Sequence, residues 1–130
     1  MAIVGTWRLV KSTAVSQDGE TLPGPFGGEH AMGRLTFASH GRMMGMICDG
    51  RSELASDQRR ENTFYCGNYT FDGQRLITRV DVAIDPTRIG TEQVREVSFD
   101  GPLMVLRPPL RSHNGRMEQH ELVWEKMADV

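Results

Sequence analysis

Apolar and polar residues alternate along short stretches of this chain, and turn-forming dipeptides separate the stretches. Alternation with a period of two is typical of a β-strand that buries one face. The pairs between the stretches include Asp18-Gly19, Asp72-Gly73, Asp100-Gly101 and Asn114-Gly115. Such pairs favour tight hairpins because both turn positions tolerate positive φ. The pattern predicts about eight antiparallel strands, over residues 5–16, 32–39, 42–48, 63–71, 74–84, 91–99, 102–107 and 116–126.

Four connecting segments lack this alternation. Residues 22–28 are rich in proline and glycine, which excludes regular structure over most of that loop. Residues 49–62 are mostly polar with capping side chains near their start, so we predict one short helix there. Residues 85–90 and 108–112 are predicted to be connections, because proline interrupts the hydrogen-bond ladder of a sheet.

The two tryptophans of the chain lie near its two ends. Trp7 is in the first predicted strand and Trp124 is in the last, and we expect these strands to pair. Such pairing closes a barrel and removes the exposed edges of an open sheet. About eight strands also suffice for a closed barrel to hold one small ligand. The expected fold is all-β: an antiparallel, up-and-down barrel with one short helix, formed by residues 1–130 as a single domain.

Short motifs along nearly the whole chain resemble a known family. They include Gly5-Thr6-Trp7-Arg8-Leu9, Gly33-Arg34-Leu35-Thr36-Phe37, Tyr65-Cys66-Gly67-Asn68-Tyr69 and Leu122-Val123-Trp124-Glu125. This succession resembles the bacterial and fungal lipocalin-like domain family. The resemblance implies a lipocalin-like barrel with a cavity, in which Trp7 plugs the narrow end. It implies no particular activity, since some barrels of this shape are isomerases, cyclases or lyases and many only bind.

Charge and composition exclude several classes of partner. The formal net charge is -2, and the 15 basic residues are scattered among 17 acidic ones, so no concentrated basic face is available for nucleic acid. No apolar run approaches the roughly 18 residues of a membrane span, and no secretion-signal pattern is visible. We expect a cytoplasmic protein that binds neither nucleic acid nor a membrane. Cys48 and Cys66 are then reduced thiols.

Alternation also assigns one face of each strand to the barrel interior. One interior group is apolar and comprises Trp7, Val97, Phe99, Leu122 and Trp124. The other group is polar and comprises Tyr65, Tyr69, Thr78, Gln93, Arg95, Glu118 and His120. An apolar cavity with a few convergent polar groups is typical of a small-molecule site. We predict that the polar group, together with Phe37 and Met43, binds a ligand.

Two further positions bear on the shape of that cavity. Gly67 lies between Tyr65 and Tyr69 on one face, and its missing side chain is expected to leave room against the wall. Val82 shares its predicted face with Leu76, Thr78 and Val80 and is assigned to the interior.

His120 is the candidate acid or base of the predicted cavity. The unperturbed pKa of histidine, near 6.5, suits proton transfer at neutral pH. Tyr65 or Tyr69 can hold a substrate oxygen, and Arg95 can bind a carboxylate or stabilise an oxyanion. The opposite interpretation is structural: His120 is hydrogen-bonded inside the barrel and Arg95 is paired with Glu118. The sequence leaves both open.

Three functions fit these features. The leading hypothesis is a barrel that binds a small, largely apolar molecule, aromatic or polyketide-like, bearing a carbonyl or carboxylate. The alternative is a cofactor-independent isomerase, cyclase or lyase with His120, Tyr65 and Arg95 as catalytic residues. A barrel filled by its own side chains, with a structural or partner-binding role, is the third. No cofactor and no metal are expected, because the histidines lack metal-ligand spacing.

A second copy of the chain is a further expected partner. Met44, Met46, Ile77 and Val94 fall on faces assigned to the outside. Apolar residues at such positions need cover, either from the short helix or from a second subunit. A homodimer satisfies this need.

Overall fold

The structure is a computed structural model that describes residues 2–113 and 115–129. In these residues, ten strands and two single-turn 3-10 helices follow one another along the chain. The strands are β1 (Gly5–Ser16), β2 (Thr21–Leu22), β3 (Ala31–Phe37), β4 (Arg42–Asp49), β5 (Asn62–Phe71), β6 (Arg75–Ala83), β7 (Glu92–Asp100), β8 (Leu103–Arg107), β9 (Arg111–His113) and β10 (Arg116–Ala128). The 3-10 turns are η1 (Gly28–His30) and η2 (Pro86–Arg88).

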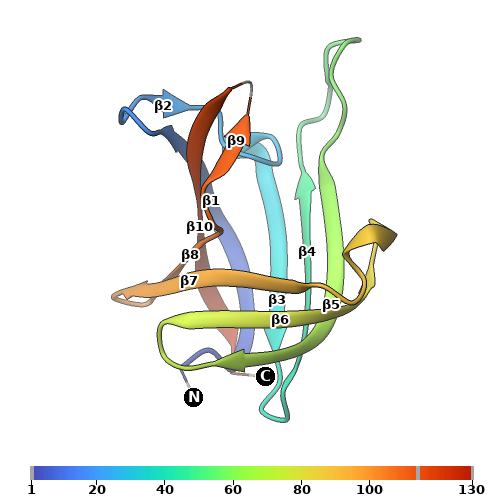
Figure 1. The fold of residues 1–130 in the computed structure, drawn as a ribbon, viewed down its shortest axis with the longest axis vertical. Helices are drawn as coiled ribbons and strands as arrows, with labels where there is room; N and C mark the ends of the chain where they lie inside the picture. The colour runs from blue at the N-terminus through green and yellow to red at the C-terminus, as the bar shows by residue number, and fades with distance from the viewer. Residues whose placement is uncertain (1, 114, 130) are drawn as a thin grey trace.

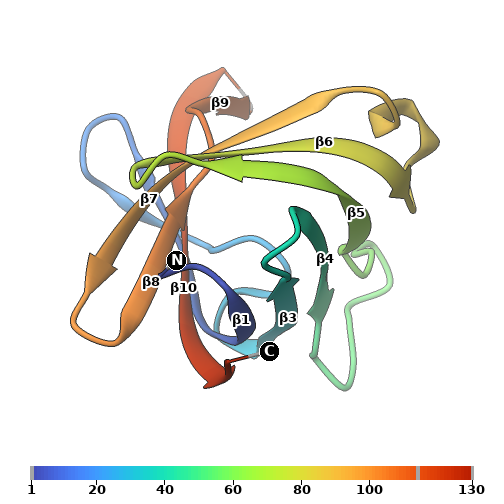
Figure 2. The same ribbon diagram turned by 90° about the horizontal axis from the view of Figure 1, so that it is seen from below.

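Pairing of β1 with β10 closes the sheet into a barrel (Figure 1). The strand order is β2-β1-β3-β4-β5-β6-β7-β8-β10-β9, with β1 and β10 also paired, and every pair is antiparallel. Seen from below, the strands of the wall surround the interior (Figure 2). The short strands β2 and β9 lie at the two ends of the strand order, next to β1 and β10. The predicted closed, all-β barrel and the pairing of its two tryptophan strands are confirmed.

The predicted helix over residues 49–62 is wrong. Asp49 ends β4, Asn62 begins β5, and the residues between them form an irregular hairpin connection. This segment has no apolar stripe with which a helix could pack against the barrel. The Arg60 guanidinium instead donates hydrogen bonds to the carbonyls of Asp49 and Arg51, at 2.9 and 2.5 Å. Without a helix, the outward side chains of Met44 and Met46 stay exposed.

A β-bulge between β5 and β6 reverses the faces of the end of β6. Cys66 pairs with Val82 and the next residue, Gly67, pairs with Val80, so Asp81 is the extra residue. Such an insertion turns every following side chain to the opposite face. The side chain of Val82 is therefore 48% exposed, contrary to the prediction, and Ala83 packs against the core instead.

Side chains fill the end of the barrel near the two termini. The Trp7 indole N–H donates to the carbonyl of Ile3 at 2.9 Å. Phe37 and Tyr69 meet edge to face with ring centroids 5.1 Å apart, and the Tyr69 hydroxyl donates to the carbonyl of Ala38 at 2.7 Å. Burial raises the pKa of the Tyr69 hydroxyl. This end is a packed core, as expected for a barrel plugged by Trp7.

Three smaller predictions are also corrected or left open. Phe99 is 41% exposed rather than interior, because it lies next to the β7–β8 turn, where it contacts the ring of Phe71. Residues 111–112 belong to β9 rather than to a rigid link. The predicted turn at Asn114-Gly115 falls partly outside the described residues. The described residues contain no helix with the length and hydropathy of a membrane span.

Candidate functional site

A pocket of about 500 Å³ is lined by inward-facing residues of the barrel and by residues of the connections between its strands. Its rim comes from connections between strands: Phe26 after β2, Arg88 in η2, and Pro108 and Pro109 between β8 and β9. Its walls are inward positions of β3, β4, β8 and β10, namely Leu35, Ile47, Leu106 and Leu122. This volume lies within the range of small-molecule sites.

Trp124 forms the apolar floor of this pocket. Its side chain is fully buried and lines the pocket. The ring fits because the facing residue on β3 is Gly33, where a Cβ would lie only 3.0 Å from the Trp124 Cη2 atom. The Trp124 indole N–H is buried and has no hydrogen-bond partner among the described residues. Trp7, which the sequence placed beside Trp124 at the dry end, does not line the pocket.

Three arginines line the pocket: Arg88 from η2, Arg95 from β7 and Arg111 from β9. Arg88 is the most firmly held. Its guanidinium donates to the Thr63 hydroxyl at 2.9 Å and to the side-chain oxygen of Gln93. It also lies over the ring of Tyr65, 4.8 Å from the ring centroid. All three of these partners are uncharged side chains, and Arg88 forms no ion pair with a carboxylate of the described residues.

Arg95 is a partly buried cation without an ion-pair partner in the described part of the chain. Its guanidinium donates to the carbonyl of Val94 at 2.8 Å. Burial is the main cause that lowers the pKa of Arg95; the interaction with the Tyr65 side chain opposes this, and the positive charges of Arg88 and Arg111 lower the pKa further. The pairing of Arg95 with Glu118 that the sequence left open is not formed.

Glu118 instead contacts the candidate acid or base, His120. The distance from His120 Nε2 to Glu118 Oε1 is 2.8 Å, and the two side chains are 10% and 12% exposed. His120 lines the pocket and Glu118 does not. When His120 is neutral, a proton on Nε2 donates to the carboxylate and leaves Nδ1 as the acceptor. This arrangement can transfer a proton at the pocket wall.

The structure brings together part of the predicted site. Four of the predicted residues line the pocket, namely Tyr65, Gln93, Arg95 and His120. Four others are buried and do not line it, namely Phe37, Met43, Tyr69 and Thr78. Sequence reasoning missed Phe26, Arg88 and Arg111, which lie in or next to segments interpreted only as connections. In the sequence, the only feature that marks these three residues is that they lie near prolines of the connections. The alternation of apolar and polar residues gives no prediction for such segments.

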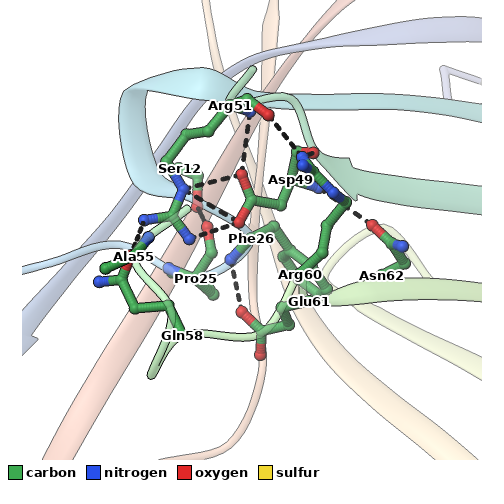
Figure 3. A network of polar contacts seen from close by, with 10 residues as sticks. All are labelled: Ser12, Pro25, Phe26, Asp49, Arg51, Ala55, Gln58, Arg60, Glu61 and Asn62. Atoms are coloured by element: carbon green, nitrogen blue, oxygen red, sulfur yellow. Dashed lines mark hydrogen bonds and ion pairs between the residues drawn. The ribbon is translucent and has the colours of Figure 1, made fainter. Parts of the chain in front are cut away.

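A polar network beside the pocket holds the 23–28 loop over its rim (Figure 3). The backbone N–H of Phe26 donates to the Glu61 carboxylate at 2.6 Å, and the Ser12 hydroxyl donates to the carbonyl of Pro25 at 2.7 Å. Phe26 has a φ of 59°, a left-handed conformation that is uncommon for a bulky residue. These bonds hold that conformation and place the Phe26 ring at the pocket.

Asp49 and Arg51 form the centre of this network. The Asp49 carboxylate is buried and accepts from the backbone N–H, Nε and Nη2 of Arg51, the last at 2.5 Å. The hydrogen bonds from the Arg51 side chain are the main cause that lowers the pKa of Asp49 to about 2. Gly27 packs directly on this carboxylate, because a Cβ there would overlap Asp49 Oδ1.

Acid is expected to remove the contribution of Asp49 to stability. The pKa of Asp49 falls from 3.8 to about 2 on folding. Its contribution to the free energy of unfolding is therefore complete at a pH above its pKa in the unfolded chain, and it is lost as the pH falls through its pKa in the folded protein. Thermal unfolding of wild type and Asp49→Asn should show wild type more stable near neutral pH. The difference should shrink between about pH 4 and about pH 2. A difference that stays constant down to pH 2 would contradict this role.

Comparison with known proteins gives one match. The sequence matches the family described as "Lipocalin-like domain" over residues 4–127. No curated protein and no solved structure matches the chain. The match spans nearly all of the described barrel, from the residue before β1 to the penultimate residue of β10. The chain therefore belongs to the lipocalin-like domain family.

Proposed function

We propose that this barrel binds one small, largely apolar molecule that carries a carbonyl or carboxylate group. The observation that carries the proposal is the pocket itself, which combines the apolar floor of Trp124 and the apolar walls of Leu106 and Leu122 with a few hydrogen-bond donors. Apolar walls with a few placed polar groups are the usual composition of a small-molecule site. Membership of a family of lipocalin-like barrels supports the same function.

Each polar group of the pocket offers the ligand a different contact. Arg88 and Arg95 present donors at the rim, Tyr65 offers a hydroxyl and a ring face, and the buried N–H of Trp124 lacks a partner in the described residues. A donor buried without a partner costs free energy, and a ligand oxygen would satisfy it. The apolar body of the ligand would lie against Leu35, Ile47 and Leu122.

Titration with N-phenyl-1-naphthylamine, a neutral aromatic probe whose fluorescence rises in apolar surroundings, tests this function. We expect saturable binding of one probe per chain, with a dissociation constant on the order of micromolar. Competition by aromatic carbonyl and carboxylic compounds should then displace the probe. A signal that rises linearly without saturation, or no signal, would contradict a binding pocket.

A second candidate is an enzyme, and the contact between His120 and Glu118 favours it. A carboxylate behind a pocket-lining imidazole is a common arrangement for a general acid or base. The reaction class would be a cofactor-independent isomerisation, cyclisation or elimination on a carbonyl compound. Turnover across a panel of aromatic and polyketide-like carbonyl compounds separates the two functions. Turnover lost in His120→Ala with affinity retained would favour the enzyme, whereas loss of affinity alone would favour the binding protein.

A further inference from the structure

We propose that the ligand is an anion: an organic carboxylate whose charged group is bound by Arg88 and Arg95 at the rim while its apolar body occupies the pocket. This inference rests on the proposed binding function and narrows it, because it separates carboxylates from neutral carbonyl compounds. It also assigns the main anion-binding role to Arg88, a residue in a segment that the sequence indicated only as a connection.

The charge balance of the pocket is the first observation. Three arginines line it, and the lining residues include a single carboxylate, Glu92. Elsewhere the described chain neutralises many of its arginines. Six of them form ion pairs with carboxylates, namely Arg8, Arg42, Arg51, Arg75, Arg107 and Arg116. The three arginines of the pocket form no ion pair with another described residue. Arg34, Arg59, Arg60 and Arg79 lack one as well, but the three pocket arginines line one shared cavity, where a single anion could offset their charge.

The second observation is that neutral side chains hold the Arg88 guanidinium in one orientation. The Thr63 hydroxyl and the Gln93 side-chain oxygen fix two of its nitrogens, and its guanidinium carbon lies over the Tyr65 ring. These neutral contacts orient the group without cancelling its charge. A guanidinium held in one orientation loses little conformational entropy when it binds a planar carboxylate through parallel N–H bonds. Arg88 is therefore built as a receptor for such a group.

The third observation is that the positive charge of Arg95 is energetically unfavourable where it lies. Its guanidinium is partly removed from water and lies close enough to Arg88 and Arg111 to feel their charges. Burial without a counter-ion and repulsion between like charges both oppose the cationic form. Among the described residues, the Arg95 side chain donates a hydrogen bond only to the Val94 carbonyl, which leaves its other N–H groups available. A bound carboxylate would remove both costs.

A matched pair of probes tests whether the pocket prefers an anionic ligand. The probes 1-pyrenebutyrate and 1-pyrenebutanol share the pyrene ring and the carbon chain, and they differ in that the first ends in a carboxylate and the second in a hydroxyl. We expect wild type to bind the butyrate about 10-fold or more tightly than the butanol, because charge-assisted hydrogen bonds are worth more than neutral ones. Arg88→Gln and, independently, Arg95→Gln should each weaken butyrate binding by about 10-fold. Butanol binding should weaken much less in both variants, so that the preference for the butyrate falls.

The control is Arg79→Gln, which removes the same charge from an exposed position on β6 that does not line the pocket. It should change neither affinity, and circular dichroism should confirm that all three variants fold. Equal affinity for the two probes, unchanged in Arg88→Gln and Arg95→Gln, would overturn the anion proposal and leave the binding function intact. Failure of both probes to bind would instead overturn the proposed function.

Discussion

Replacing Gly67 by alanine is expected to lower the free energy of unfolding by roughly 3 kcal/mol or more, the upper range for overpacked cores. A Cβ at Gly67 would overlap the carbonyl oxygen of Arg79, with the carbonyl carbon next at 2.8 Å. Both atoms are backbone of the adjacent strand, so no side chain can move aside. The strands β5 and β6 would have to move apart at the bulge, and this would break several hydrogen bonds of the barrel wall.

Chemical denaturation of Gly67→Ala and Thr70→Ala tests this. Thr70 lies on the same strand with an exposed side chain, so its substitution should cost only a few tenths of a kcal/mol, up to about 0.5. If Gly67→Ala were as stable as Thr70→Ala, the close approach of β6 to Gly67 would not exist.

A tryptophan in place of Leu122 is expected to weaken binding of N-phenyl-1-naphthylamine by about 10-fold or more. Leu122 lies on β10 and lines the pocket, so a larger side chain there can extend into the open volume. It would then occupy the space in which the ligand binds. Because the added atoms enter a pocket rather than packed core, the loss of stability should be about 1–3 kcal/mol at most.

Met44→Trp is the matched control. It adds the same side chain on β4, at an exposed position on the outer wall. Probe affinity should be unchanged. Equal weakening in the two variants would mean that the probe does not bind in the pocket, and unchanged affinity in Leu122→Trp would place the ligand elsewhere.

Alternation and turn dipeptides predicted the barrel well because both act locally. The first strand runs from Gly5 to Ser16 as the sequence predicts, and the eight wall strands all occur within a few residues of their expected bounds. The bulge at Asp81 was beyond this reasoning. Val80-Asp81-Val82 has the same alternating pattern as a regular strand, so only the pairing with β5 reveals the extra residue. Gly67 accordingly makes room for backbone and not for a ligand.

The site was predicted less completely, for two physical reasons. Alternation determines which face of a strand a side chain occupies but not its height in the barrel, which depends on strand tilt and stagger. Tyr69 and Thr78 are inward as predicted, yet they are buried away from the pocket with Phe37 rather than at its rim. Connections also carry much of the rim, and no periodicity governs where a residue such as Arg88 projects.

The most direct test of a ligand pocket above Trp124 uses the fact that the chain has only two tryptophans. Labelling with 5-fluorotryptophan gives two fluorine NMR signals, and the variant Trp7→Phe assigns them. On addition of N-phenyl-1-naphthylamine, the Trp124 signal should shift and saturate at one probe per chain, while the Trp7 signal in the packed end should stay in place. A shift of the Trp7 signal alone, or no shift of either signal at saturating probe, would contradict the account.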